Sequence, residues 1–208
     1  GLGIPAEPLF RSRDDGYIRF FLMHSITYRT QMLRDMGYRQ TEGISYTDTE
    51  WSCYPVFRAK DITFLDINLY QYNLAREGQT MDPKVLARSL DQMELMTRKL
   101  IEFLESYDLQ TLSGERLRFI RQYYLNRVRI MLKCLLLDIP RNMFDAEHFT
   151  ELESYLTGVT LKYGLGTVRL YPENKIIRFN ALRYWRRHHK RWPAWFEAFN
   201  RFVNRIMT

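Results

Sequence analysis

The sequence predicts a predominantly helical α+β protein, with a mixed α/β layer over residues 1–80 and a helical bundle over residues 81–208. Before Met81, short β-branched and aromatic runs alternate with amphipathic helical patterns. After Met81, apolar residues recur only at the three- and four-residue spacing of helices. The 46% hydrophobic and 26% charged residues are typical of globular proteins, and 208 residues suffice for one large domain or two small ones.

The first part is expected to contain two strands and two short helices. Residues 17–23 are a β-branched and aromatic run of strand length, and residues 62–72 are an apolar run that leads to the polar turn 76–80. Between them, residues 28–36 predict a helix that Gly37 ends, and residues 47–59 predict another. Two strands are too few for a self-sufficient sheet, so the α/β layer is expected to be partial.

Helices alone are expected after Met81. Their starts are marked, in chain order, by Asp82-Pro83, Ser113, Asp145, Pro172 and Pro193. The second helix is expected to stop at Pro140 and the third near Gly164. In the fifth, an aromatic and aliphatic stripe is formed by Trp195, Phe199, Phe202 and Ile206.

Positive charge is concentrated at the C-terminal end. Residues 181–208 hold seven Arg or Lys and one Glu, so they carry +6 of the net +7 and leave +1 for the rest. Because basic residues are not spread over a larger surface, nucleic acid is not an expected partner. The tail 183–205 interleaves basic residues with tryptophans and fits an element that binds a membrane surface. The alternative is that the aromatic stripe packs on the bundle while the arginines are solvated.

Cysteine usage and hydropathy bear on the compartment. Cys53 and Cys134 give neither a metal-ligand spacing nor a disulfide framework, which favours a reducing environment. No apolar run approaches the length that spans a bilayer. We therefore expect a cytoplasmic protein, peripheral at the inner face of the membrane where the tail binds lipid. The chain opens Gly1-Leu2-Gly3 and its first methionine is Met23, so we expect a piece of a longer protein.

A short acidic stretch, "YTDTEW", stands at the start of the helix predicted over 47–59. Thr47 and Glu50 have the spacing of a capping box, and Asp48 in the first turn complements the helix dipole. The same position can present a carboxylate to a cleft, where it would deprotonate an attacking hydroxyl group. Trp51 offers an apolar face of the kind on which sugar rings stack. The two interpretations are compatible, and both stay open.

Three segments carry a family resemblance: "MHSITYRTQML", "GISYTDTEW" and "LYQYNLAREGQT". Together they resemble the second half of family-2 glycosyltransferases of the GT-A fold. That family carries an acidic turn, commonly Glu-Asp followed by an acid and an aromatic, then a strand ending in Leu-Tyr-x-Tyr and an Arg-x-Gly-Ser type of turn. Here Thr47 stands in place of the first acid, Asp48 matches the aspartate, and Gln79-Thr80 replace the serine.

The resemblance implies that residues 1–80 are the C-terminal half of a GT-A-like domain and that residues 81–208 are a helical extension. It implies transfer of a sugar, with inversion, from a nucleotide-sugar to a hydroxyl group of a cell-envelope or exopolysaccharide glycan. Asp48 would be the catalytic base, and Glu50 and Trp51 would shape the acceptor pocket. Arg76, with the turn that contains Gln79, would face the donor diphosphate. Without the resemblance, a solvated turn arginine is the preferred interpretation of Arg76.

His24 follows the first expected strand, where an α/β fold lines its cleft. It would contact substrate or phosphate there; the alternative is a hydrogen-bonded structural histidine.

The chain departs from the family in having no Asp-x-Asp motif. A divalent metal, Mg²⁺ or Mn²⁺, is expected for the full-length parent and none for this segment, which is expected to be inactive alone. Two alternatives belong to other classes. One is a non-catalytic helical interaction module in which the acidic turn only starts a helix. The other is a peripheral membrane adaptor that works through its tail.

Overall fold

The computed structural model describes residues 23–61, 63, 83–112, 114–170, 180–196, 198–199 and 202. These residues are predominantly helical, and no strand occurs among them. The two expected strands lie outside the described residues except for Met23, which begins a 3₁₀ turn, and Thr63. The chain divides into two compact units, one taken from Gly1–Asp82 and Ser89–Tyr124, the other from Pro83–Arg88 and Leu125–Thr208.

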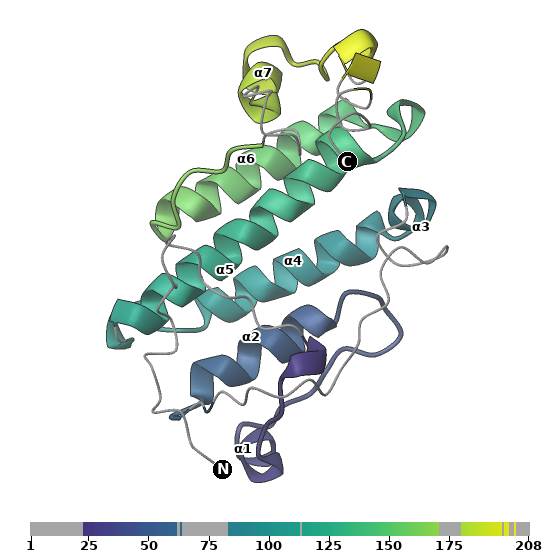
Figure 1. Cartoon of the computed structure of the whole chain (residues 1–208). Helices are drawn as coiled ribbons and strands as arrows, with labels where there is room; N and C mark the ends of the chain where they lie inside the picture. The colour runs from purple at the N-terminus through teal and green to yellow at the C-terminus, as the bar shows by residue number, and fades with distance from the viewer. Residues whose placement is uncertain are drawn as a thin grey trace. The chain divides into compact units, whose positions relative to one another are not determined.

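In the first unit, helix α2 (Asp48–Arg58) packs against the 3₁₀ turn Met23–Ser25, helix α1 (Thr30–Asp35) and helix α4 (Leu90–Glu105) (Figure 1). Helix α5 (Gly114–Lys133) begins in this unit, and the boundary falls after Tyr124. The buried core of the unit is formed by Cys53, Val56, Phe57, Met93, Met96, Leu100, Ile101, Leu104, Phe119, Ile120 and Tyr124.

Helix α1 ends as its glycine predicts. Gly37 has φ +62, and its N–H donates to the carbonyl of Arg34 at 3.0 Å. The N–H of Tyr38 donates to the carbonyl of Leu33 at 2.9 Å. This pair of bonds is the Schellman arrangement, which requires a left-handed residue at the position of Gly37. The predicted end of the helix over 28–36 is therefore confirmed, although α1 begins at Thr30, two residues later than predicted.

Helix α2 matches the prediction over 47–59 and contains Pro55 in its interior. A proline has no N–H, so the carbonyl four residues earlier, that of Trp51, loses its usual helical donor. The hydroxyl of Tyr28 donates to this carbonyl at 2.8 Å instead. The side chain thus satisfies a backbone acceptor that the proline would otherwise leave unpaired.

The prediction of a single helix after Asp82-Pro83 is wrong, because the helix is interrupted at Ser89. Ser89 has φ −125 and ψ +20, and it separates helix α3 (Pro83–Arg88) from α4. The Ser89 side chain is buried, and its Oγ lies 3.0 Å from the hydroxyl oxygen of Tyr46. The two helices belong to different units. The break therefore falls where the chain passes from one unit to the other.

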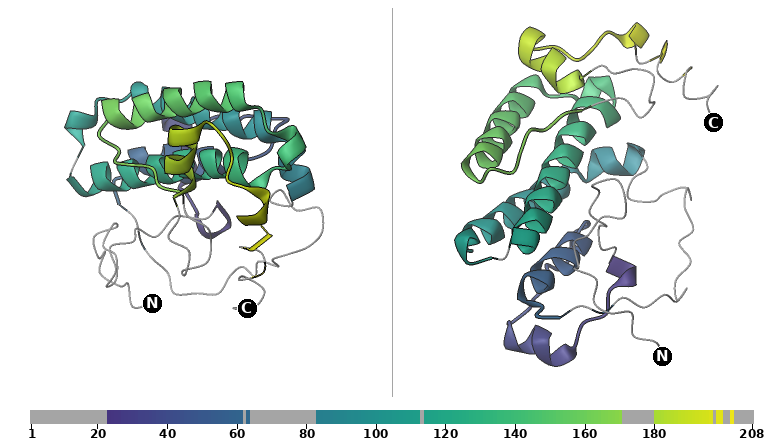
Figure 2. Two further views of the ribbon diagram at one scale, coloured as in Figure 1. Left: turned by 90° about the horizontal axis from the view of Figure 1, so that it is seen from above. Right: turned by 60° about the vertical axis from the view of Figure 1, so that its left-hand side comes forward.

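In the second unit, the later part of α5 lies beside helix α6 (Ala146–Lys162) (Figures 1 and 2). A π-helical turn, Cys134–Asp138, follows α5, and Ile139 is extended before Pro140, as a residue preceding proline prefers. A 3₁₀ turn, Arg141–Met143, leads to α6. The Asp145 side chain accepts hydrogen bonds from the N–H groups of Glu147 at 2.9 Å and His148 at 3.0 Å, which confirms the predicted cap.

Helix α7 (Ala181–His188) completes the second unit, and the Asn180 side chain caps its start. The start predicted at Pro172 lies outside the described residues. After Pro193, the described residues 194–196, 198–199 and 202 are helical, as predicted. None of the helices that the described ranges contain is long and apolar enough to cross a membrane.

Candidate functional site

The loop that precedes α2 is held in a strained conformation. Gly43 has φ +76, and Tyr46, which is not a glycine, has φ +67. A left-handed backbone costs a non-glycine residue about 1–3 kcal/mol, so neighbouring contacts must enforce it. The Tyr46 hydroxyl pairs with Ser89, and the N–H of Ser45 donates to Oε1 of Gln92 at 2.8 Å. These two contacts pin the loop to the start of α4.

Glu50 is only 2% exposed and braces the same loop from the other side. Its Oε2 accepts a hydrogen bond from the N–H of Thr41 at 2.7 Å, and its Oε1 accepts one from the Thr41 hydroxyl at 2.8 Å. Nζ of Lys99, on α4, donates to that hydroxyl oxygen at 2.7 Å. Charged hydrogen bonds of this kind are stronger than neutral ones, and the buried carboxylate has both oxygens satisfied.

The predicted capping box is therefore wrong. Thr47 is at the N-cap, but its φ of −71 and ψ of −10 are helical, and its side chain makes no cap hydrogen bond. An N-cap side chain reaches the first turn from an extended backbone. The Thr47 hydroxyl oxygen instead accepts from Nε2 of Gln40 at 2.9 Å. Glu50 is unavailable to a capping box because Thr41 occupies its oxygens.

Asp48 has the opposite surroundings, although it stands two residues away. It lies in the first turn of α2 and its side chain is exposed. Within the part of the chain that the structure describes, its carboxylate has neither a hydrogen bond nor an ion pair. A carboxylate at a helix start is favoured by the helix dipole. Asp48 is therefore the acid of this turn that remains available to a ligand.

Trp51 lies half-buried in an aromatic cluster at the same end of α2. Its indole meets the ring of Tyr28 at 4.9 Å and the ring of Tyr38 at 5.7 Å, both nearly perpendicular at 71°. Each edge-to-face pair of this kind stabilises the fold by about 0.5–1.5 kcal/mol, beyond the stabilisation from burying the rings. The contacts fix the orientation of the indole and leave part of its surface to solvent.

Three tyrosines of this unit have a raised pKa and keep their hydroxyl proton: Tyr28, Tyr38 and Tyr54. Burial, with a smaller contribution from Glu50, raises the pKa of Tyr38 to about 12. Burial also raises the pKa of Tyr28 and of Tyr54 well above the usual value. The Tyr38 hydroxyl is buried, and no partner for it exists among the described residues. A buried hydroxyl without a partner costs about 1–3 kcal/mol.

The thiol of Cys53 lies in the core behind this cluster. It is fully buried, and burial raises its pKa well above the usual value. A nucleophilic cysteine needs a thiolate and access to substrate, so Cys53 is a core residue.

Of the other predicted site residues, the structure describes His24 but not Arg76 or Gln79. His24 is half-buried in the 3₁₀ turn that packs on α2, and it is not without an interaction partner. Arg76 and Gln79 lie outside the described residues. The structure thus places Asp48, Glu50 and Trp51 on one helix with His24 against it, and Asp48 and Glu50 differ in exposure.

The residues that sequence reasoning missed lie on α4 and in the loop. Three residues at the start of α4 or on it bind the loop before α2, at separations of three and seven residues. Ser89 pairs with Tyr46, Gln92 accepts from Ser45, and Lys99 donates to Thr41. Helix α4 carries several other polar and charged residues, so helical spacing alone does not separate these three from its solvated face. Thr41 carries no comparable signal because its role depends on Glu50 and Lys99, which are distant in sequence.

Comparison with known proteins gives no relative: no family model, curated protein or solved structure matches the chain. Among the described residues, no three His, Cys, Asp or Glu side chains gather where they could hold a metal ion.

Proposed function

We propose that this chain forms the acceptor side of an inverting glycosyltransferase and that Asp48 is its catalytic base. The supporting observation is the placement of two neighbouring acids. Glu50 is buried and accepts hydrogen bonds from Thr41, whereas Asp48 is exposed in the first turn of the same helix. The motif order that resembles family-2 glycosyltransferases assigns the catalytic role to the same aspartate.

The surroundings of Asp48 favour this role because they are rigid. Ser45 and Tyr46, just before it, are bonded to α4, and Glu50, just after it, is bonded to Thr41. A catalytic group gains rate when its position is fixed before the substrate arrives. Trp51, packed on Tyr28 and Tyr38, would offer the remaining surface of its indole to an acceptor sugar.

In the proposed reaction, the Asp48 carboxylate accepts the proton of the acceptor hydroxyl as that oxygen attacks the anomeric carbon. The new carbon–oxygen bond forms on one face of the sugar while the bond to the nucleoside diphosphate breaks on the other. The nucleoside diphosphate leaves with the electron pair. A single displacement of this kind inverts the anomeric configuration. A divalent metal in the longer protein would stabilise the leaving group.

The roles proposed for the remaining residues follow from the resemblance. Arg76 and Gln79 would contact the donor diphosphate, and His24 would line the cleft. The glycan acceptor is proposed to belong to the cell envelope or an exopolysaccharide. Glu50 is proposed to position the acidic turn and not to contact the acceptor, because its oxygens are already occupied.

The test is the stereochemistry of transfer by the longer protein that contains this segment. It would be incubated with a panel of nucleotide-sugars and Mg²⁺ or Mn²⁺, and release of nucleoside diphosphate would identify the donor. NMR coupling constants would then give the anomeric configuration of the product. We expect inversion. Transfer with retained configuration, or no transfer from any donor, would contradict the proposal, and the second result would favour a non-catalytic helical module.

A further inference from the structure

An uncovered aromatic stripe follows α7 in the second unit. The exposed fractions are 68% for Trp195, 49% for Phe199 and 60% for Phe202. These described residues are helical, and their separations of four and three residues match the spacing of one helix face. The interpretation in which this stripe packs on the bundle is therefore wrong for these three residues. Large apolar side chains gathered on one exposed face indicate a binding surface.

The chain immediately before the stripe is firmly anchored. Trp192 is buried, and its ring packs on that of Phe196 at 4.8 Å. The guanidinium of Arg191 donates to the carbonyls of Ile139 at 3.0 Å and Leu137 at 3.3 Å, and that of Arg141 donates to the carbonyl of Trp192. The stripe therefore projects from a fixed base in the folded unit.

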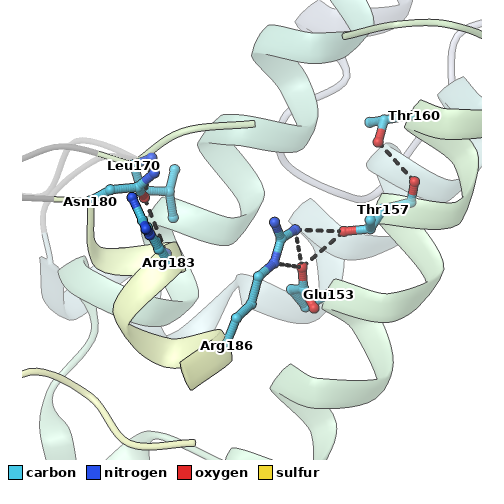
Figure 3. A network of polar contacts seen from close by, with 7 residues as sticks. All are labelled: Glu153, Thr157, Thr160, Leu170, Asn180, Arg183 and Arg186. Atoms are coloured by element: carbon cyan, nitrogen blue, oxygen red, sulfur yellow. Dashed lines mark hydrogen bonds and ion pairs between the residues drawn. The ribbon is translucent and has the colours of Figure 1, made fainter. Parts of the chain in front are cut away.

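Helix α7 is anchored as well, through one arginine and one tryptophan. The Arg186 guanidinium binds Oε1 of Glu153, with Nε at 2.8 Å, and donates to the hydroxyl of Thr157 at 3.0 Å (Figure 3). Trp185 is buried between the rings of Phe144 and Phe149. Arg186 is thus used within the fold.

Three other basic residues of this region are not used in that way. Arg183, Arg187 and Lys190 are exposed, and no ion pair involves them within the described ranges. They stand on or just after α7, a few residues before the aromatic stripe. The region thus combines uncompensated positive charge with an uncovered apolar face that contains a tryptophan.

We propose that the exposed basic and aromatic residues of this region bind an anionic lipid surface: Arg183, Arg187, Lys190, Trp195, Phe199 and Phe202. Tryptophan and phenylalanine favour the boundary between headgroups and acyl chains, and arginine and lysine attract acidic headgroups. A second copy of the chain is a poorer occupant of the same face, because pairing would bring the two sets of positive charges together. This inference goes beyond the proposed sugar transfer and does not depend on it.

Co-sedimentation of the 208-residue chain with lipid vesicles tests the proposal. We expect binding to vesicles of phosphatidylcholine with phosphatidylserine and weak or no binding to phosphatidylcholine alone. Raising the salt from about 0.1 M to about 1 M shortens the Debye length from about 10 Å to about 3 Å and should release the protein.

Substitutions separate the two contributions. The double variant Trp195→Ser/Phe199→Ser should bind at least about tenfold more weakly, because two large apolar side chains no longer enter the lipid. The variant Arg187→Gln/Lys190→Gln should lose about fivefold in affinity for each charge and show a weaker salt dependence. Circular dichroism should show an unchanged fold, since all four side chains are exposed.

The matched control is Leu161→Ser, which removes an apolar side chain that is 75% exposed on α6. It should bind vesicles as the parent chain does. Absence of binding to acidic vesicles, or equal losses in the control and the aromatic variant, would overturn the proposal. So would a concentration-dependent dimer that the aromatic substitutions abolish, because a second copy would then be the occupant.

Discussion

The substitution Asp48→Asn, made in the longer protein, is expected to lower the rate of sugar transfer by about 10²–10⁴-fold, the usual contribution of a general base. An amide has nearly the size of the carboxylate but cannot accept the proton of the attacking hydroxyl. The loss should appear in kcat at saturating donor and acceptor, because binding of either substrate does not require the proton transfer. Initial rates of nucleoside diphosphate release measure it.

Asp91 provides the matched control for this variant. It is also an exposed acid in the first turn of a helix in the same unit, the start of α4. Asp91→Asn removes the same charge from the first turn of another helix, so it reports the effect of the helix dipole without the proposed catalytic role. Transfer by this control should stay close to that of the parent. Equal rates for the two variants would show that Asp48 only starts its helix.

The substitution Trp185→Ala is expected to lower the free energy of unfolding of the second unit by about 3–5 kcal/mol, the cost of truncating a buried aromatic to alanine. Trp185 is 2% exposed, and its ring packs edge-to-face on Phe144 at 5.3 Å and on Phe149 at 4.9 Å. Truncation leaves a cavity beside both rings. Urea unfolding followed by far-ultraviolet circular dichroism measures the change.

Arg187→Ala serves as the control for Trp185→Ala because it changes an exposed residue of the same helix. A surface substitution of this kind should alter the free energy of unfolding by no more than about 0.5 kcal/mol. A free energy of unfolding for Trp185→Ala within about 1 kcal/mol of that of the parent chain would contradict the burial of Trp185 against Phe144 and Phe149.

Signals local in sequence predicted much of the helical structure. Gly37 and Gly164 both end helices in the left-handed conformation, and Asp145 caps α6. The apolar spacing after Pro83 located α4, and the pattern over 47–59 located α2. These features depend on a few consecutive residues, and such residues carry their own conformational preferences.

Features that depend on distant residues were not predictable in the same way. The helix break at Ser89 accompanies a hydrogen bond between the side chains of Ser89 and Tyr46. Glu50 accepts hydrogen bonds from Thr41 and does not form the expected capping box. In both cases a tertiary contact overrides a valid local pattern. The exposure of Trp195 depends on how much of the bundle surface other side chains cover, and helical spacing alone does not contain that information.

The sequence predicted the helix start that carries Asp48 and Glu50, but not the difference between their exposures. The sequence places Asp48 and Glu50 at one helix start, and both were expected to serve the substrate. The structure buries Glu50, which accepts hydrogen bonds from Thr41, and exposes Asp48. Arg76 and Gln79 stay predictions from the resemblance.

The free energies of unfolding of Glu50→Gln and Asp48→Asn, measured side by side in this chain by urea denaturation, test this difference most directly. Glu50→Gln should destabilise the protein by about 1–3 kcal/mol, because a buried charged acceptor is lost and an amide N–H is left facing Thr41. Asp48→Asn should stay within about 1 kcal/mol of the parent, the scale of a first-turn dipole effect. A stable Glu50→Gln variant beside a strongly destabilised Asp48→Asn variant would contradict it.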